Sequence, residues 1–551
     1  MSDFTGNKSA KISEVFTDLN RKFEEQQAQR MAKVHNLPYF DLTGFPIDQA
    51  VLAEVPEDTA SSAQAIPFFK EGPLLRIAMV DPENPNLLAL LKELKKKSEA
   101  ELYLVSKSGL AVALRQYKKI IVPAVSPSSK HEVVVATGAD VLEKLKNLPK
   151  LGAGVGELSI SEILGMIIGA AVNTRSSDIH LEPEKKFVKV RFRIDGVLQD
   201  VVMLPVSIIR NLLSRIKLLS GLKLNITSAP QDGRFSIKSG ERSLDLRVSV
   251  LPTNYGESVV IRILGIQDVG LNINDLGLRG SAFKVIEEEL AKPNGMILTT
   301  GPTGSGKTTT LYAFLNYLNR PGVKIITLED PVEYQLEGIN QTPIDRAAGM
   351  DFAKGLRSIL RQDPDIVMVG EIRDFETGET AAQAALTGHV VLSTLHTNDA
   401  AGAIPRLLDL GVKPVTLAPA LNALLAQRLL RRICPDCKEV YRPSSKELER
   451  VRGVFSQIPR KSGVEVPERL IFYHSKGCAK CHNLGYRGRV GIFEVFAVDD
   501  KIQQAIFDQV STNQIKKLAQ EQGMVTMQQD AILKALEGLT DLAEVWRVTE
   551  K

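Results

Sequence analysis

The stretch that decides the fold is Gly301-Pro302-Thr303-Gly304-Ser305-Gly306-Lys307-Thr308, a glycine-rich loop in the middle of the chain. It fits the pattern of a phosphate-binding loop, in which glycine and four further residues precede Gly-Lys-Ser or Gly-Lys-Thr. Glycines let backbone N–H groups surround phosphate oxygens, Lys307 reaches the β and γ phosphates, and the Thr308 hydroxyl can ligate Mg²⁺. The alternative is a glycine-rich turn without a ligand, but an apolar strand at 296–300 and a helical pattern from Thr309 supply the right context. We therefore expect a nucleotide to be held by Gly301, Pro302, Thr303, Gly304, Ser305, Gly306, Lys307, Thr308 and Thr309.

Short apolar segments alternate with helical patterns on both sides of that loop. The apolar segments are residues 296–300, 324–328, 366–369 and 390–394. Such alternation is typical of a parallel sheet covered on both faces by helices. The sequence therefore predicts an α/β nucleotide domain over residues 279–551, with an irregular region at 434–490 and a helical tail at 498–551.

Acidic and imidazole side chains follow three of these strands. Glu329 follows the second strand, Glu371 the third and His396 the fourth, and His389 lies in a turn just before the fourth. The carboxyl ends of parallel strands meet at one edge of a sheet, and phosphoryl transfer needs carboxylates near the metal and the attacking water. We expect these carboxylates and His396 to face that edge, with His396 at the γ-phosphate and His389 as a further candidate. Helix-capping or surface carboxylates and structural histidines are the alternatives.

Two smaller α+β domains are predicted before the nucleotide domain. The predicted boundaries are a first domain at 1–118, a linker at 119–150, a second domain at 151–265 and a linker at 266–278. The first linker contains the sequence PAVSPSSK at 123–130, which is rich in proline and serine. Apolar residues at helical spacing predict a helix at 11–34, which we expect to pack on its own domain; a helix that docks on a partner is the alternative.

The composition excludes several classes of protein. The chain has 551 residues, of which 44% are apolar and 24% charged, so it is not fibrous, disulfide-knotted or wholly disordered. The net charge is +4 and aromatic residues make up 5%, so we expect no nucleic-acid binding. No apolar run approaches the ~20 residues that span a bilayer, and the N-terminus has no apolar signal core. We therefore expect a cytoplasmic chain.

The chain has four cysteines, and they form two Cys-x-x-Cys pairs, Cys434 with Cys437 and Cys478 with Cys481. Two such pairs can complete a tetrahedral Zn²⁺ site, and a reducing cytoplasm disfavours disulfides. The 40 residues between the pairs exceed the usual spacing, which indicates an insertion. We expect a closed structural zinc site with His482 as a bystander; redox pairs and unmetallated thiols are the alternatives.

Four sequence boxes together resemble a known superfamily. GPTGSGKTT, TLEDPVEY, LRQDPDIVMVGEIRD and TGHVVLSTLHTNDA, in this order, resemble the ATPases of type II secretion and type IV pilus systems. Residues 177–183 (SDIHLEP) and 231–235 (QDGRF) look like the second, PAS-like N-terminal domain of that superfamily, and 39–42 with 77–82 look like its first. The resemblance covers most of the chain from about residue 30, is greatest to type IV pilus assembly ATPases, and implies a RecA-like nucleotide domain.

The resemblance implies roles in catalysis for the residues at the strand ends. Lys307 and Thr308 would hold ATP with Mg²⁺. Glu329 would polarise the attacking water and Glu371 would hold Mg²⁺ through water, although the sequence leaves the division of those two roles open. Gly370 stands where the strand before Glu371 usually carries an aspartate.

The resemblance also implies that arginines of the second domain reach the phosphates. Arg247 and Arg262 match those arginines, Arg234 is a third candidate, and the guanidinium group suits phosphate binding. Surface salt bridges are the alternative for all three. The chain departs from the usual pattern at Gly378, where a better helix former is usual, and in the loop 344–346, so helix stability and loop contacts there are in doubt.

The function implied is a homo-hexameric ATPase that drives assembly of type IV pili or a type II secretion pseudopilus. It would move an inner-membrane platform protein and associate with the inner face of the membrane through that partner. The first domain and the paired cysteines favour assembly motors over retraction motors. A DNA-uptake or conjugation motor and a nucleotide-gated scaffold are the alternatives. Some relatives bind a regulatory nucleotide in the first domain, but the leading Arg-Leu-Gly segment is missing, so we expect no binding of cyclic di-GMP.

Overall fold

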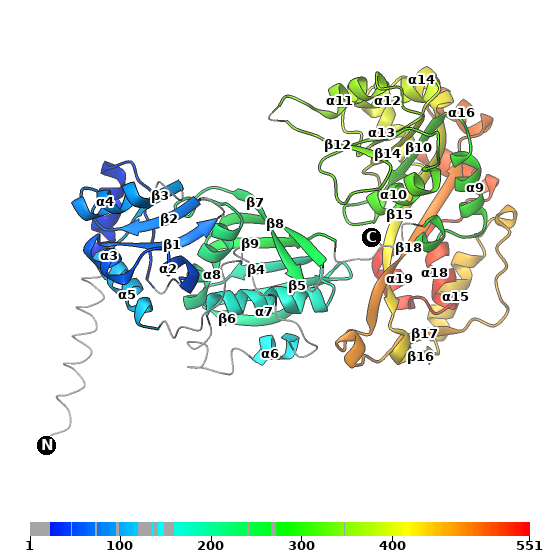
Figure 1. The fold of residues 1–551 in the computed structure, drawn as a ribbon. Coiled ribbons are helices and arrows are strands. Elements are labelled where there is room, and N and C mark those ends of the chain that lie inside the picture. Colours follow the sequence, from blue (N-terminus) through cyan, green and yellow to red (C-terminus); the bar gives the residue numbers. More distant parts are fainter. Residues whose placement is uncertain are drawn as a thin grey trace. The chain divides into compact units, whose positions relative to one another are not determined.

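Figure 1 shows a computed structural model of the chain, which divides into two compact units, Met1–Ile266 and Gln267–Lys551. The residues that the structure describes are 23–119, 135, 141–147, 159–265 and 272–550, except 44, 46, 72–73, 95–98, 240–241 and 347. The predicted helix before residue 23, most of the predicted linker 119–150 and the hinge at 266–271 lie outside them. Within the described residues, no helix is long and apolar enough to cross a bilayer.

The first part of unit 1 is a small sheet with helices. Its strands β1 (Ala65–Glu71) and β2 (Leu74–Met79) are antiparallel, and β3 (Glu99–Leu104) is parallel to β2. Its helices are α2 (Gln49–Leu52), α3 (Glu57–Ser62), α4 (Pro85–Leu94), α5 (Lys107–Leu114) and the 3-10 helix η1 (Arg115–Lys119). The helix at 23–34 packs on this part, because Ala28 and Ala32 are buried against Leu104. This confirms the expected packing for the described portion of that helix.

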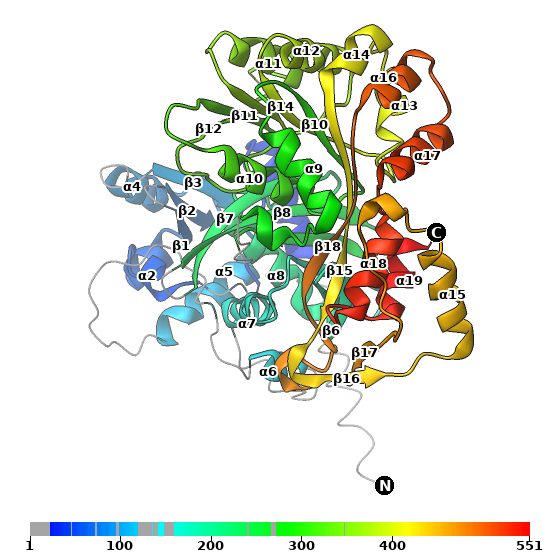
Figure 2. The ribbon, with the colours of Figure 1, turned by 90° about the vertical axis from the view of Figure 1, so that its right-hand side faces the viewer.

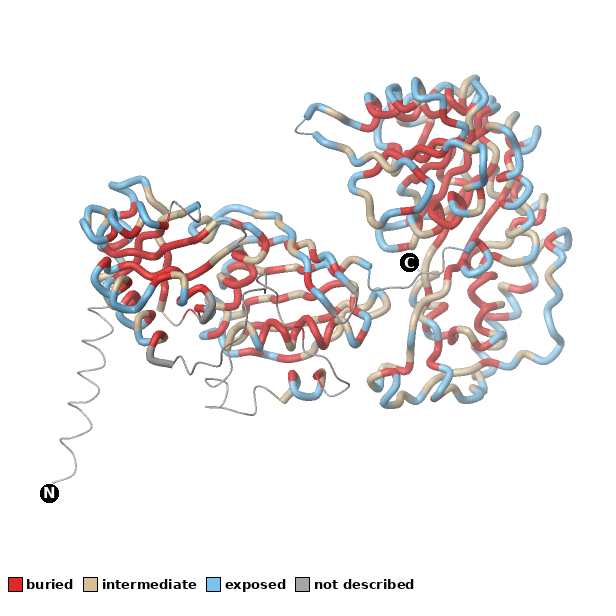
Figure 3. Tube along the Cα trace, viewed as in Figure 1, coloured by how far each residue is buried: buried red, intermediate tan, exposed pale blue. Residues whose placement is uncertain are grey.

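The second part of unit 1 is a six-stranded antiparallel sheet in the order β6-β5-β4-β9-β8-β7. The strands are β4 (Asp178–Pro183), β5 (Phe187–Ile194), β6 (Val197–Pro205), β7 (Gln231–Ser239), β8 (Arg242–Thr253) and β9 (Gly256–Ile263). Alternate residues of these strands pack with α7 (Ile160–Asn173) and α8 (Val206–Leu219) in one core, which Figure 3 colours as buried. The helix α6 (Val141–Asn147), inside the predicted linker, buries Val141 and Leu145 in the same core.

Unit 2 is built on a seven-stranded sheet in the order β12-β11-β13-β14-β10-β15-β18. The four predicted strands are confirmed as β10 (Gly295–Thr300), β11 (Ile325–Glu329), β13 (Ile366–Val369) and β14 (Val390–Leu395), all parallel. Helices α9 (Gly280–Leu290) and α10 (Lys307–Leu318) cover one face. The other face is covered by helices that include α11 (Phe352–Leu360), α12 (Phe375–Leu386) and α14 (Pro414–Ala420) (Figure 1). The mixed α/β architecture is therefore as predicted.

Three strands of this sheet are not predicted from the sequence. They are β12 (Asn340–Pro343), β15 (Leu421–Ile433) and β18 (Tyr486–Ala497). β15 is parallel to β10 and antiparallel to β18, and Figure 2 shows β15 and β18 as a long ribbon that extends beyond the other strands. The ribbon leads to the two-stranded sheet of β16 (Lys438–Tyr441) and β17 (Phe472–Ser475).

The C-terminal part of unit 2 is helical, as the sequence predicts. Its helices are α16 (Asp500–Phe507), α17 (Thr512–Gln522), α18 (Met527–Leu536) and α19 (Leu542–Thr549). A further helix of unit 2, α13 (Ala403–Asp409), lies between β14 and α14. The prediction that 434–490 is irregular is wrong in part, because α15 (Ser445–Phe455) is a regular helix. The Ser444 hydroxyl accepts from the N–H of Glu447, and the Glu447 carboxylate accepts from the N–H of Ser444 in a capping box.

The structure explains the unusual glycine at position 378. It lies in α12 against a neighbouring loop, and a Cβ there would be 3.0 Å from Val412 Cγ2 and 3.3 Å from Ile372 Cγ2. We expect Gly378→Ala to lower the free energy of unfolding by about 1 kcal/mol, because overpacking outweighs the better helix propensity of alanine. Chemical denaturation monitored by circular dichroism measures the change.

The matched control is Gly453 in the exposed part of α15, where an added Cβ would meet nothing within 4 Å. Gly453→Ala should raise the free energy of unfolding by about 0.5–1 kcal/mol. If Gly378→Ala stabilised the protein as much as Gly453→Ala, the close packing around α12 would be refuted.

A buried carboxylate joins α19 to β15. Glu544 is 1% exposed and accepts from the Arg431 N–H at 3.0 Å, from Arg431 Nη2 at 2.8 Å and from Arg547 Nε at 2.6 Å. Burial alone would raise the pKa of Glu544, but the hydrogen bonds from the two arginines lower it to about 2.

We expect Glu544→Gln to lower the free energy of unfolding by about 3 kcal/mol near neutral pH, because it leaves Arg431 without its anion. Because the folded-state pKa is depressed, this stabilisation is present above the ordinary value of 4.5 and is lost as the pH falls toward about 2. The difference in unfolding midpoint between the two proteins should therefore shrink below pH 4.5. The control is Glu550→Gln, which removes an exposed partner of Arg450 and should cost less than about 0.5 kcal/mol.

Candidate functional site

The phosphate-binding loop joins the carboxyl end of β10 to the amino end of α10. Gly306 has a left-handed φ of 88° immediately before α10, and Gly304 has a φ of 78° with open space where a Cβ would lie. A Cβ at Gly301 would lie 2.4 Å from the carbonyl oxygen of Gln427 on β15. The loop therefore needs glycine both for its backbone conformation and for the close approach of a neighbouring strand.

Lys307 is folded onto the loop that carries it. Its Nζ donates to the carbonyl oxygens of Gly301 at 2.7 Å and Pro302 at 3.2 Å, and the residue is 9% exposed. Burial lowers the pKa of Lys307, and the charge of Glu371 opposes that shift. The two carbonyl oxygens are uncharged, so a terminal phosphate would be a stronger, anionic partner for this ammonium group. The phosphate-binding loop and Lys307 therefore fit a bound nucleotide.

Glu329 ends β11 and is enclosed by three donors. Tyr312 on α10 donates its hydroxyl to Glu329 Oε2, while Thr327 Oγ1 at 2.5 Å and Gln341 Nε2 at 3.1 Å donate to Oε1. Glu329 is 3% exposed. Burial and this hydrogen bond raise the pKa of Tyr312, which stays protonated and keeps donating. A water polarised by Glu329 would have to take the place of one of these donors.

Glu371 and His396 meet at the carboxyl edge of the sheet, as predicted. Glu371 follows β13 and His396 follows β14, and His396 Nε2 lies 3.2 Å from Glu371 Oε2. The other oxygen, Oε1, accepts from Arg373 Nη2 at 2.7 Å, and this contact raises the pKa of Arg373. The side chain of Glu371 is 14% exposed and that of His396 47% exposed, so the imidazole is the more accessible group.

The loop that carries His396 is tied to β10. The Thr397 N–H donates to Thr300 Oγ1 at 2.8 Å, and the two threonine hydroxyl oxygens are 2.7 Å apart. Thr300 is the last residue before the phosphate-binding loop, so these bonds hold His396 beside that loop. His389, by contrast, precedes β14 and lies at the opposite edge, with Nδ1 3.0 Å from the carbonyl oxygen of Ala384. The expectation that His389 faces the phosphates is therefore wrong.

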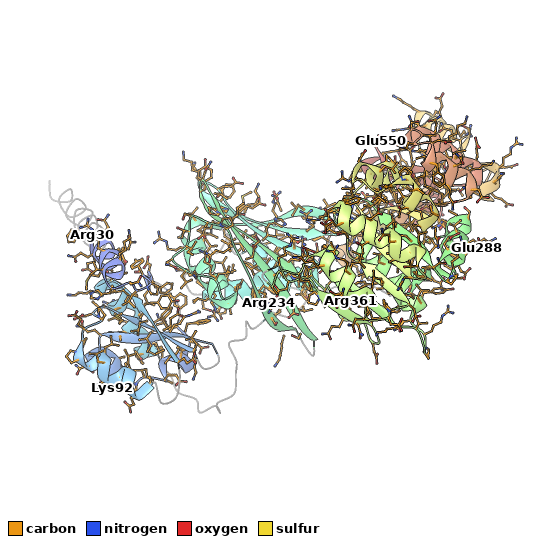
Figure 4. The ribbon with its side chains drawn as sticks, turned by 90° about the horizontal axis from the view of Figure 1, so that it is seen from above. Arg30, Lys92, Arg234, Glu288, Arg361 and Glu550 are labelled. Carbon is orange, nitrogen blue, oxygen red and sulfur yellow. The ribbon has the colours of Figure 1, made fainter. Side chains whose placement is uncertain are left out.

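The three candidate arginines, Arg234, Arg247 and Arg262, belong to the six-stranded sheet of unit 1, and their positions are compared within that unit alone. Arg262 on β9 lies directly opposite Arg247 on β8, and Arg247 lies opposite Arg234 on β7. Figure 4 labels Arg234 on the edge strand of this sheet. The structure therefore brings the three arginines together in one row across three strands.

Several residues that support the candidate nucleotide site are not predicted from the sequence. Tyr312 and Gln341 hold Glu329, and Arg373 holds Glu371. Gln427 accepts a hydrogen bond from Thr310 Oγ1 at 2.7 Å, which ties β15 to the first turn of α10. Of these residues, Arg373 lies two positions after Glu371, so its contact with Glu371 could have been predicted from the sequence.

The four cysteines form one cluster at the end of the β15–β18 ribbon. Their sulfur atoms lie within 4.8 Å of one another, with Sγ–Sγ distances of 3.9 Å for Cys434–Cys478 and Cys437–Cys481 and 3.7 Å for Cys478–Cys481. Four ligands on a tetrahedral Zn²⁺ with Zn–S bonds of about 2.3 Å lie about 3.8 Å apart. The donor set and its spacing therefore fit zinc, and this cluster does not include His482.

Backbone N–H groups favour thiolate sulfur in this cluster. The N–H groups of Cys478 and Gly485 donate to Cys481 Sγ at 3.1 Å and 3.3 Å. Burial raises the pKa of Cys481, but these hydrogen bonds outweigh it and lower the pKa to about 7. Burial raises the pKa of Cys437. Asp436 and Lys480, one from each pair, form an ion pair beside the cluster.

A phosphate-binding loop beside carboxylates at the edge of a parallel sheet defines a P-loop nucleotide hydrolase. Residues 155–547 match the family described as type II/IV secretion system protein, and the chain belongs to that family. Residues 35–121 match the MshEN domain. The resemblance predicted from the four boxes is thus confirmed.

Two curated relatives and one solved structure illustrate the similarity. The type IV pilus assembly ATPase PilB of Myxococcus xanthus is 38% identical over 526 residues, which cover 95% of this chain and 90% of that protein. The type II secretion system protein E of Pseudomonas aeruginosa is 46% identical over 392 residues, covering 71% of this chain and 76% of that protein. The Legionella pneumophila ATPase DotB has a TM-score of 0.50 at 19% identity, covers 70% of this chain and 95% of that chain, and supports the fold alone. The chain is an ATP-hydrolysing enzyme and resembles PilB over most of its length.

The cysteine cluster predicts one zinc ion per chain. We expect purified protein to contain one equivalent of zinc by elemental analysis, and Cys437→Ser or Cys481→Ser to remove it and lower the unfolding temperature. His482→Ala, next to Cys481 in the chain, should retain the metal. Zinc-free protein with an unfolding temperature equal to that of the untreated protein would contradict a structural zinc site.

Proposed function

We propose that this protein is a homo-hexameric motor that hydrolyses Mg·ATP to assemble a type IV pilus or a type II secretion pseudopilus. Its partner is the inner-membrane platform protein of that machine, and it works in the cytoplasm at the inner face of the membrane. The observation that carries the proposal is the group formed by Lys307, Glu371 and His396 beside the phosphate-binding loop. Similarity to PilB over 95% of the chain supports the assembly role.

The proposed roles follow from the contacts of each side chain. Thr308 and Glu371 hold Mg²⁺, with Glu371 acting through water, and Mg²⁺ supplies charge stabilisation when bound. Lys307 leaves the carbonyl oxygens of its own loop for the β and γ phosphates. His396 contacts the γ-phosphate, because it is the exposed end of the pair with Glu371. Glu329 polarises the attacking water after that water replaces one of its donors.

Arg247 and Arg262 are proposed to complete the site from the second N-terminal domain, with Arg234 as a further candidate. Arg262 has a side chain that is 58% exposed, on the sheet face turned away from the core of unit 1. Their guanidinium groups would neutralise phosphate charge as the domain closes on the nucleotide. We also propose that this domain is PAS-like and that the boundaries between domains and linkers lie at residues 118, 150, 265 and 278.

The deciding experiment measures Mg²⁺-dependent phosphate release by the full chain with the cytoplasmic part of the platform protein present. We expect Lys307→Ala to lower the rate at least about 100-fold, because it removes charge stabilisation of the transition state. Lys292→Ala, a lysine exposed on the surface of the same unit, should keep the activity of the parent protein. Phosphate release that is equal in the parent and Lys307→Ala would overturn the proposal.

The two alternative functions predict different outcomes. A nucleic-acid motor would bind DNA with an affinity that falls steeply with salt, whereas we expect no such binding. A nucleotide-gated scaffold would form its oligomer equally with ATP and a non-hydrolysable analogue and would release no phosphate.

A further inference from the structure

A row of charged residues crosses five strands of the six-stranded sheet. Reading across the strands, Arg193, Asp178, Arg262, Arg247 and Arg234 stand directly opposite one another on β5, β4, β9, β8 and β7. The sequence neighbours Phe192, Ile179, Ile261 and Leu246 lie in the core and Phe235 packs against it, so the row occupies the other face. Within this row, Arg262, Arg247 and Arg234 are like charges at directly opposed positions and repel one another, so this part of the face favours an anion.

Asp178 is the single carboxylate in that row, and it is 4% exposed although it lies on the face turned away from the core. Its Oδ1 accepts from Arg262 Nε at 2.9 Å, and its Oδ2 lies 3.4 Å from Arg193 Nε. Ser177 Oγ also donates to Oδ2 at 2.8 Å. Both carboxylate oxygens are therefore engaged, and Asp178 sits between two arginines that would otherwise repel each other.

The bond between Asp178 and Arg262 uses only one nitrogen of the guanidinium group. Nε of Arg262 is directed at Asp178, and the side chain remains 58% exposed. Within the part of the chain that the structure describes, Nη1 and Nη2 of Arg262 donate to no other side chain. A guanidinium group held by Nε has a fixed plane and can offer its Nη donors to a second anion.

We propose that Asp178 is a positioning residue of the nucleotide site, which holds Arg262 by its Nε so that the Nη groups are presented to the phosphates of ATP. This inference rests on the proposed role of Arg262 in the function above. Asp178 itself does not contact the nucleotide. It lowers the cost of ordering a long side chain before the anion arrives and reduces repulsion from Arg193.

The matched control is a second ion pair between the same two strands. Glu182 on β4 accepts from Arg191 Nη2 on β5 at 2.5 Å and 2.7 Å through its two oxygens, and Glu182 is four residues from Asp178 on the same face. Removing the charge of Glu182 tests what the loss of a carboxylate does to this sheet in general. Glu182→Gln therefore separates positioning of Arg262 from stability of the sheet.

The experiment compares kcat and KM for ATP in the full chain and its variants. We expect Asp178→Asn to lower kcat/KM about tenfold, the size of effect produced by loss of one charge-assisted hydrogen bond. In an Arg262→Ala background the same substitution should change kcat/KM less than about twofold, because the residue through which Asp178 acts is gone. Glu182→Gln should change kcat/KM less than about twofold in both backgrounds.

Each result bears on one of the two proposals. If Arg262→Ala lowers kcat/KM but Asp178→Asn does not, or if the two effects simply multiply, the positioning role is overturned and the role of Arg262 stands. If Arg262→Ala has no effect, the proposed role of Arg262 fails, and the inference about Asp178 fails with it. If Asp178→Asn does not fold, Ser177→Ala takes its place, and we expect it to lower kcat/KM about two- to threefold with an unchanged unfolding temperature. An unchanged kcat/KM in a folded Ser177→Ala protein would then overturn the positioning role.

Discussion

The close approach of β15 to the phosphate-binding loop is the constraint on which the nucleotide unit depends. The carbonyl oxygen of Gln427 would lie 2.4 Å from a Cβ at Gly301, and its side-chain Nε2 would lie 2.8 Å from one at Gly306. The same side chain accepts from Thr310 Oγ1 at 2.7 Å. Two glycines of the phosphate-binding loop are therefore required by the protein's own packing. The shape of the loop is set by a strand more than a hundred residues later in the chain.

The strands that carry the catalytic candidates could be predicted from the sequence. The strand β15, which packs against the phosphate-binding loop, could not. The segments 296–300, 324–328, 366–369 and 390–394 are short apolar runs, as buried parallel strands usually are. The segment that forms β15, LNALLAQRLLRRI, consists mostly of leucine, alanine and arginine, which are strong helix formers. It is a strand because β10 and β18 pair with it on either side, and such tertiary context overrides local propensity.

The candidate site shows the same division between local and distant information. Strand order and direction place Glu371 and His396 at one edge, so their contact could be predicted from where each follows its strand. The same rule, applied to strand direction, places His389 at the opposite edge. The donors around Glu329 could not be predicted, because Tyr312 and Gln341 reach it only after α10 and β12 have packed beside β11.

The position of the cysteine cluster has a consequence for the β15–β18 ribbon, which joins it to the phosphate-binding loop. Cys434 directly follows the last residue of β15, and Cys481 precedes the first residue of β18 by only a few residues. The cluster therefore lies at the end of the ribbon where β15 finishes and β18 begins. A metal ion held by both cysteine pairs would cross-link the two strands there. Antiparallel strands can slip in register only in steps of two residues, or about 7 Å, if the same side chains are to face the core. Four bonds to one ion would prevent such a step, so the metal would fix the register between β15 and β18. It would do so about 20 Å from the phosphate-binding loop, whose shape depends on β15.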